Sequence, residues 1–194
     1  MVLRTHMKES AILLFSFLLL MVIWYDGPAL AENASLSNLV ITNNRDDLLL
    51  FLETENAFTD KIKTATLSGV PVTFTFYITL VKVRNFWLDK KIRDKEVYHT
   101  IVYDNLKKTF SISRSWVRGG PVTTPSFAEA KQLMSEIKSF KIAPLKKLTK
   151  GNLYQLRVKA KLNKQTLPYY LDSVLFFISR WDAETDLYTL DFIY

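Results

Sequence analysis

Hydrophobic and polar side chains alternate strictly along two long segments of this chain. Between residues 72 and 80 one face of the segment is apolar and comprises Val72, Phe74, Phe76, Ile78 and Leu80. The segment Leu153–Leu162 alternates in the same way, and its polar face is mostly cationic. A period of two residues is the pattern of a β-strand with one buried face. Shorter segments of this kind predict six further strands: Leu36–Thr42, Leu48–Glu53, Val97–Tyr103, Leu106–Arg114, Val174–Trp181 and Leu187–Tyr194.

Short polar connections link several of these predicted strands. Asn43–Asp46 separates the first two, Asp104–Asn105 separates Tyr103 from Leu106, and Asp182–Asp186 precedes the last strand. These residue types tolerate the backbone angles of tight turns. The connections therefore predict antiparallel hairpins between neighbouring strands.

Two segments have helical spacing instead. Ala57–Leu67 is followed by Gly69, which suits the left-handed position that ends many helices. The segment Ser126–Ser139 is apolar along one face, and Ser126 and Glu129 have the spacing of a capping box. Residues 118–121 and 140–151 show neither period and are predicted to be irregular.

Together these elements predict a mainly β fold. We expect an antiparallel β-sandwich, or a strongly curved sheet, of about eight strands with one or two helices packed on it. No internal repeat or linker divides residues 32–194, so a single domain is expected there. That length is sufficient to bury a stable core without cross-links.

The first 31 residues have the pattern of a secretory signal peptide. Charged residues near the start precede an apolar run, Ala11–Trp24, which is shorter than the roughly 20 residues of a membrane-spanning helix. Ala29-Leu30-Ala31 then supplies the small residues of a cleavage site. We expect cleavage before Glu32 and a periplasmic product that meets the membrane only during export. The alternative is a retained membrane anchor, since Trp24 and Tyr25 lengthen the apolar run.

Amino-acid composition limits which reactions and partners are possible for residues 32–194. The chain has no cysteine, which excludes disulfides, thiol chemistry and lipid attachment at the processing site. Its formal charge of +7 is spread over many positions rather than concentrated in blocks. Ordinary solvated faces explain such a distribution, and the alternative is attraction to an anionic partner in the envelope. Nucleic acid is not expected in that compartment.

Motifs of catalysis are missing from the sequence. His99 is the only histidine after residue 31, it lies in a predicted strand, and no Gly-x-Ser-x-Gly elbow or glycine-rich phosphate loop accompanies it. We expect a structural or surface role for His99 and no enzyme, cofactor or metal site. A hydrolase using paired carboxylates is a weaker alternative. Its candidate residues are Asp172, Asp182, Glu184 and Asp186, three of which lie in a predicted turn.

Aromatic residues next to cations are the remaining candidates for a binding site. Phe86 and Trp87 precede Asp89, Lys90, Lys91 and Arg93, and Trp116 lies between Arg114 and Arg118. Such groups either close the end of a core or form an aromatic rim that contacts a carbohydrate, a peptide or a lipid headgroup. The candidate interaction surface comprises Phe86, Trp87, Arg93, Trp116 and Arg118.

The order of several motifs resembles one family. Ser68-Gly69-Val70-Pro71-Val72-Thr73-Phe74 enters a long strand, and Phe86-Trp87-Leu88-Asp89 and Val102-Tyr103-Asp104-Asn105-Leu106 follow it. Later come Phe127-Ala128-Glu129-Ala130, the strand 154–162, and Leu167-Pro168 followed by a Trp-containing terminal strand. This order resembles the bacterial domain of unknown function 4390 over nearly the whole exported chain. The resemblance implies an envelope protein and supplies no reaction or ligand, and the ending on Tyr194 rather than Trp departs from the pattern.

These observations favour a non-enzymatic interaction module of the cell envelope, whose partner is another envelope protein or an anionic ligand. One alternative is a carrier of a lipid or other apolar ligand, with the inward faces of Val72–Leu80 and Val174–Trp181 lining a cavity. Another is an outer-membrane β-barrel, because Tyr188–Tyr194 alternates and ends on an aromatic residue. The short strands and the predicted helix at 126–139 argue against the barrel.

Overall fold

The computed structural model describes residues 34–163 and 184–194, which belong to one compact unit, Asn33–Tyr194. The predicted signal peptide and the predicted strand Val174–Trp181 lie outside the described residues. Within them the strands are β1 (Ser35–Asn43), β2 (Asp47–Glu55), β3 (Val72–Lys82), β4 (Lys90–Asp104), β5 (Thr109–Arg114), β6 (Val122–Thr124), β7 (Glu136–Pro144), β8 (Leu153–Leu162) and β9 (Tyr188–Ile193). The helices are α2 (Asp60–Leu67), α3 (Phe127–Ser135) and a 3₁₀ turn η1 (Leu145–Lys147).

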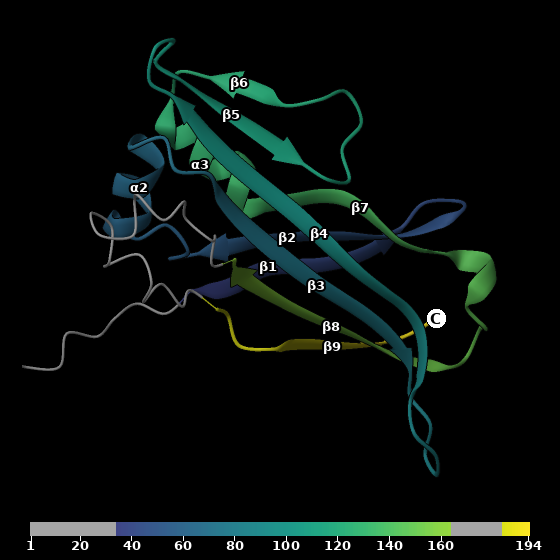
Figure 1. Cartoon of the computed structure of the whole chain (residues 1–194). Coiled ribbons are helices and arrows are strands. Elements are labelled where there is room, and N and C mark those ends of the chain that lie inside the picture. The colour runs from purple at the N-terminus through teal and green to yellow at the C-terminus, as the bar shows by residue number, and fades with distance from the viewer. Residues whose placement is uncertain (1–33, 164–183) are drawn as a thin grey trace, which may run out of the picture. The chain divides into compact units, whose positions relative to one another are not determined.

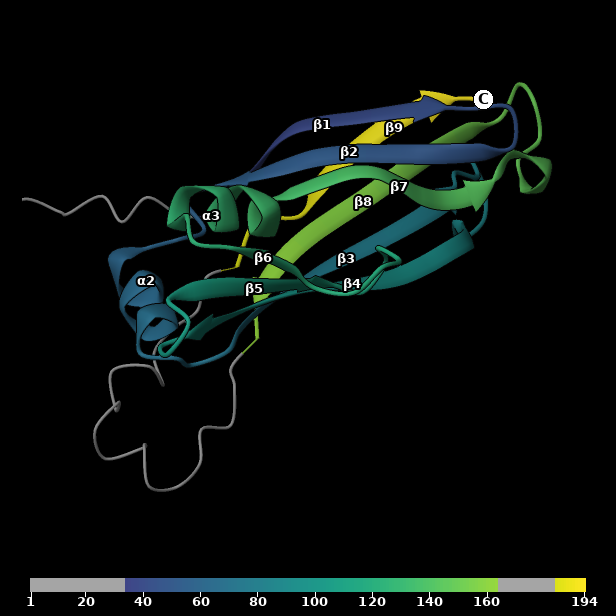
Figure 2. The same cartoon turned by 90° about the horizontal axis from the view of Figure 1, so that it is seen from above.

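The strands form two open antiparallel sheets (Figure 1). One has three strands in the order β1-β2-β7, and the other has six in the order β6-β5-β4-β3-β8-β9. Figure 2 shows the smaller sheet lying against one face of the larger one, with α3 continuing directly into β7. The predicted mainly β, antiparallel fold with packed helices is confirmed.

The core lies between the two sheets and follows from the alternation of the strands. The inward side chains of β3, from Val72 to Leu80, are all buried, and so are the alternate residues of β8 from Tyr154 to Leu162. Leu48, Leu50 and Leu52 of β2 join the same cluster from the smaller sheet. Because these faces meet, burial of apolar surface holds the sheets together without any cross-link.

Both predicted helices are present, although α2 begins at Asp60 rather than at the predicted Ala57, and its Thr59 cap was not predicted. The Thr59 side chain accepts a hydrogen bond from the Ile62 N–H at the start of α2, and Gly69 beyond its end has a φ of +82°. The Ser126 hydroxyl accepts from the Glu129 N–H at the start of α3. The Glu129 carboxylate accepts from the Thr124 hydroxyl at 2.5 Å, so only half of the predicted capping box forms.

The predicted end of the second helix is wrong, and the reason is strand pairing. The helix expected to reach Ser139 ends at Ser135, and residues 136–144, expected to be helical or irregular, form β7. This strand pairs with β2, where Ile137 lies opposite Leu52 and Phe140 opposite Leu50. Its register shifts twice, and Ser139 has a φ of +61°. Bulges break the alternation that identifies a strand in a sequence.

Strand β4 is also longer than predicted. The expected strand began at Val97, whereas β4 begins at Lys90 and pairs with β3 from Lys90 to Ile101. The residues from Lys90 to Glu96 are mostly charged and exposed, so no alternation marks them. This extension carries the β3–β4 connection well beyond the helices, as Figure 1 shows, and it positions the candidate site.

Candidate functional site

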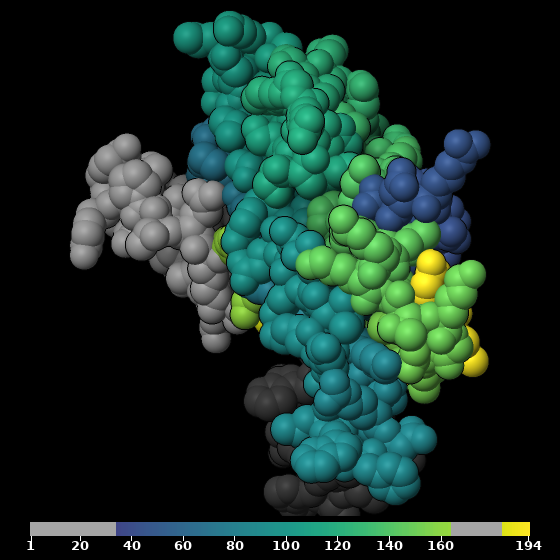
Figure 3. Space-filling model, turned by 90° about the vertical axis from the view of Figure 1, so that its right-hand side faces the viewer, coloured from purple at the N-terminus to yellow at the C-terminus, as the bar shows by residue number. Residues whose placement is uncertain are grey.

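Three consecutive apolar side chains stand exposed where β3 turns into β4. Phe86, Trp87 and Leu88 are 93%, 81% and 92% exposed. We call these three residues the aromatic tip. Figure 1 shows the β3–β4 connection projecting from the end of the larger sheet that lies away from α2 and α3, and in Figure 3 the same teal segment lies at the lower end of the molecule. The tip therefore does not close the end of the core, which was one of the two predicted roles for Phe86 and Trp87.

Strand β8 holds both sides of the turn that carries the aromatic tip. On the outgoing side the Val83 N–H donates to the Leu153 carbonyl oxygen at 3.0 Å. On the returning side the Asp89 carboxylate pairs with the Arg157 guanidinium at 2.6 Å. The Arg157 Nε–H also donates to the Gln155 side-chain oxygen. These contacts fix the base of the turn while leaving the tip in solvent.

The residues on both sides of the aromatic tip carry a net positive charge. Residues 82–95 contain six lysines and arginines and two aspartates, a net formal charge of +4 out of +7 for the whole chain. Both aspartates are engaged, Asp89 with Arg157 and Asp94 with Lys91 at 2.6 Å. The hydrogen bond from Lys91 keeps the pKa of Asp94 below its ordinary value. The surroundings of the tip therefore stay cationic over the neutral range.

Arg93 and Arg118 lie at different places in the larger sheet. Arg93 is partly buried in the half of β4 near the tip, opposite Leu80, and its Nε has no hydrogen-bond partner within the described structure. Arg118 is exposed in the loop between β5 and β6. Only Arg93 belongs to the part of the sheet that carries the aromatic tip.

Trp116 occupies a very different environment from Trp87. Its indole packs against the core, edge-on to Phe140 at 5.9 Å between ring centroids. The Trp116 Nε1–H donates to His99 Nε2 at 2.9 Å, and the Arg114 guanidinium lies over the Trp116 ring, 5.8 Å from its centroid. The predicted second aromatic patch with Arg118 does not form an exposed aromatic surface, because the ring faces inward.

His99 is fully buried and both of its ring nitrogens are satisfied. Because Nε2 accepts from Trp116, the proton lies on Nδ1, which donates to the Met134 carbonyl oxygen at 3.0 Å. Burial lowers the pKa of His99 to about 4. The imidazole is therefore neutral at pH 7 and links β4, α3 and the segment after β5, in agreement with the predicted structural role.

The predicted patches lie far apart. His99, which binds Trp116, pairs with Phe74, whereas the turn begins after the Lys82–Lys90 pair. At about 3.3 Å per residue, these two positions on β3 are roughly 26 Å apart. The five predicted surface residues therefore do not form one site, and the aromatic tip with Arg93 is separate from Trp116 and Arg118.

Two of the four carboxylates proposed for hydrolysis, Glu184 and Asp186, lie within the described residues. Glu184 binds Lys159 and, at 3.0 Å, Lys161, and the hydrogen bonds from these lysines lower its pKa. Asp186 is exposed, and Asp172 and Asp182 lie outside the described residues. Among residues 34–163 and 184–194 no group of His, Asp and Glu side chains could hold a metal ion.

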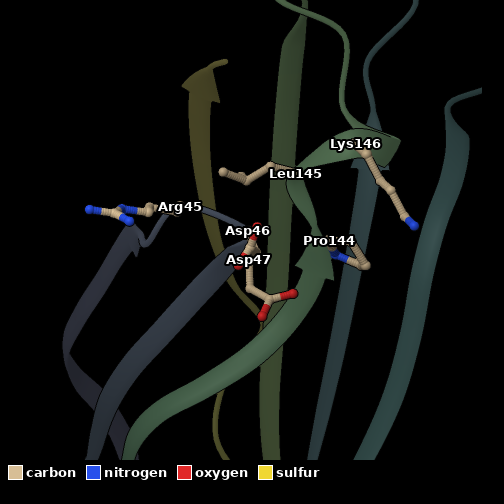
Figure 4. A pocket seen from close by; sticks show the side chains of 6 residues that line it. All are labelled: Arg45, Asp46, Asp47, Pro144, Leu145 and Lys146. Carbon is tan, nitrogen blue, oxygen red and sulfur yellow. The ribbon is translucent and has the colours of Figure 1, made fainter.

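Two depressions on the surface formed by the described residues are open to solvent. The one in Figure 4 lies where β2 begins and β7 ends, and the charged ends of Arg45 and Lys146 point away from each other there. Asp47 is engaged by Lys141 at 2.7 Å. A second depression lies between β4 and β5 beside Tyr98 and Arg114. Neither brings together side chains that would orient a ligand.

The inward face of β3, proposed as one wall of a carrier cavity, packs into the core. Phe76, Ile78 and Leu80 have no exposed surface, and they contact residues of both sheets. The other proposed wall, Val174–Trp181, lies outside the described residues. No helix in the described part of the chain is long and apolar enough to cross a membrane.

Leu88 is the tip residue that sequence reasoning missed. It continues the apolar run Phe86-Trp87 between two charged flanks, so its position in the sequence was available as a signal. The Asp89–Arg157 pair joins residues far apart in the chain, and no local pattern indicates it.

The fold and the site define a class: a mainly β protein of two antiparallel sheets whose larger sheet extends one hairpin, with an exposed aromatic tip, beyond the core. Residues 31–191 match the family described as Domain of unknown function (DUF4390), and the chain belongs to this family. No curated protein and no solved structure matches the chain.

Proposed function

We propose that this protein is an exported, non-enzymatic interaction module of the cell envelope that binds its partner through the aromatic tip. The pattern of the first 31 residues supports export. The observation that carries the binding function is the exposure of Phe86, Trp87 and Leu88 on a supported turn.

The exposure of three consecutive apolar residues in the aromatic tip is unusual. Single exposed apolar residues are ordinary, but three consecutive ones leave a contiguous apolar surface in water. Aromatic side chains supply large contact areas and are frequent at the energetic centres of interfaces. Since nothing in the described structure covers the tip, a binding partner would remove this surface from water.

The support of the turn favours binding as well. Val83 and Asp89, on either side of the tip, are both held by β8. A preformed binding element loses less conformational entropy when it meets its partner than a flexible loop does. The supported turn therefore suits a preformed contact surface.

Capture of partners from living cells tests the proposal. A photo-crosslinking amino acid at position 86 is expected to form adducts with an envelope component, and Trp87→Ala with Leu88→Ala is expected to abolish capture of the same component by tagged protein. The matched control is Leu106→Ala, because Leu106 is 95% exposed in the turn at the opposite end of β4. Equal capture by the tip variant and the control would overturn the proposed binding site.

A further inference from the structure

We propose that the partner of the aromatic tip is the surface of an anionic phospholipid bilayer, into which Phe86, Trp87 and Leu88 insert. This inference rests on the proposed function and names the partner for the same site. It follows from the chemistry of the tip, its shape and the charges around it.

The side chains of the tip match the layers of a bilayer surface. Tryptophan is enriched at the boundary between headgroups and acyl chains, where its ring is shielded and its N–H stays hydrated. Phenylalanine and leucine are the apolar residues that peripheral segments bury at the same depth. The three residues are consecutive and all are more than four-fifths exposed, so they can enter one surface together.

The size of the tip favours a bilayer over a folded protein. Aromatic side chains bury about 150–250 Å² each, so three apolar residues supply roughly 500–600 Å². A standard protein interface needs about 800 Å² from each partner. A bilayer has no such requirement, because insertion depends on the apolar area and on electrostatic attraction.

The charges flanking the tip complement an anionic surface. Arg84 and Lys90 are exposed, each two residues from the tip, and neither has an ion-pair partner within the described residues. Lys82, Lys91, Arg93 and Lys95 lie behind them along β3 and β4. The two acids among residues 82–95, Asp89 and Asp94, are both paired with cations. Clustered lysine and arginine next to an inserting segment attract anionic lipids.

The structure also sets the direction of approach. The strands β3 and β4 run from the tip toward the end of the sheet that carries α2 and α3 (Figure 1). Insertion of the tip therefore places those helices on the side away from the bilayer. Since the turn is already held by Leu153 and Arg157, insertion needs no rearrangement of the sheet.

Vesicle sedimentation tests the inference with the protein as cells produce it. We expect binding to vesicles of phosphatidylcholine with 30% phosphatidylglycerol, and at least tenfold weaker binding to phosphatidylcholine alone. Phe86→Ser with Trp87→Ser is expected to weaken binding to the anionic vesicles at least tenfold. Leu88→Ser is expected to weaken it several-fold, whereas Leu106→Ser, the same change at the opposite end of β4, leaves it unchanged.

A charge-matched pair of variants separates local attraction from net charge. Arg84→Gln with Lys90→Gln is expected to weaken binding several-fold and to reduce its dependence on salt. Lys61→Gln with Lys131→Gln removes the same two charges from the exposed faces of α2 and α3 and is expected to have little effect. Equal losses in the two double variants would overturn the proposed orientation at the membrane.

Quenching of fluorescence by brominated acyl chains identifies the inserted residue. Quenching is expected for the wild type and is expected to disappear in Trp87→Phe while vesicle binding persists. Capture of a protein from position 86 without vesicle binding would overturn the lipid inference and leave the proposed function intact. Self-crosslinking there, with no vesicle binding, would make a second copy the partner. The absence of both vesicle binding and capture would overturn both proposals.

Discussion

Trp87 and Trp116 lie at opposite ends of the β3–β4 ladder and show opposite environments for the same side chain. Each is flanked in sequence by cations, and each looks equally suited to a surface patch. Trp87 is 81% exposed at the tip, whereas Trp116 packs on the core and donates its N–H to His99. The residues next to each tryptophan in the sequence therefore do not indicate which one is exposed and which one is packed.

Long-range strand pairing makes the difference. Trp116 follows β5, which pairs with β4 from His99 to Asp104 and so brings the indole over the imidazole. Among residues 34–163 and 184–194, β8 is the strand beside the base of the turn after β3, and no strand of these residues lies beyond its end. One tryptophan therefore completes the core, and the other remains available for a partner.

The largest predicted effect is a difference in stability between the alanine variants of Trp116 and Trp87. Trp116→Ala is expected to lower the free energy of unfolding by about 3 kcal/mol, because it removes packing against Phe140 and leaves His99 Nε2 unpaired. Trp87→Ala is expected to change that free energy by less than about 0.5 kcal/mol, since its side chain is in solvent. Urea unfolding of both variants measures the contrast.

A conservative change at each position is the control. Trp116→Phe keeps an aromatic ring but removes the donor to His99, and we expect a loss of about 1–2 kcal/mol. Trp87→Phe is expected to be neutral. Similar stabilities for all four variants would contradict the assignment of Trp116 to the core.

Much of the fold was predictable from the sequence because alternation is a local signal. Polar and apolar residues alternate from Val72 to Leu80 in β3 and along β8, and the Ser126 cap and the left-handed Gly69 lie where the sequence predicted them. Strand β7 escaped detection because its bulges interrupt the alternation, and the charged half of β4 because it lies beyond the core. Both depend on partners that are distant in the chain.

The candidate site was predictable only in part, for the same reason. The apolar run at Phe86 and Trp87 marks the tip, but the choice between core and surface required the turn to be placed relative to β8. The roles of Trp116 and His99 depend on contacts among β4, α3 and the segment after β5, which no spacing in the sequence reveals.

The second-largest predicted effect is a pH dependence of the free energy of unfolding, caused by His99, the partner of Trp116. His99 has a folded pKa of about 4, below the ordinary value of 6.5, so the unfolded state binds a proton first as the pH falls. The stability associated with neutral His99 is therefore complete above about pH 6.5 and is lost progressively toward pH 4. Between pH 7 and pH 5 we expect a loss of about 2 kcal/mol, measured by urea unfolding.

A histidine replacement isolates this contribution. Burial is the main cause of the lowered pKa, while Arg114 lowers it and Glu136 raises it to a smaller extent. In His99→Gln the difference between pH 7 and pH 5 is expected to shrink to well under 1 kcal/mol, although the variant is less stable at both values. An unchanged difference would show that another group titrates in this range.

The smallest effect concerns the support of the aromatic tip. Arg157→Gln removes the ion pair with Asp89, and because both side chains are about one-third exposed the loss of global stability is expected to be below about 1 kcal/mol. The local effect is expected to be larger, because the Val83 N–H that bonds to Leu153 lies at the base of the same turn. Faster hydrogen exchange of that amide, with unchanged exchange at Ile78 in the middle of β3, would show that the pair holds the tip.

The matched control is Lys107→Gln, which removes a lysine next to Asp104 in the turn at the other end of β4. It is expected to leave hydrogen exchange of the Val83 amide unchanged. Equal exchange rates in Arg157→Gln and the wild type would mean that the backbone hydrogen bond from Val83 to Leu153 alone positions the tip. The tip would then differ from the packed environment of Trp116 in having no side-chain support.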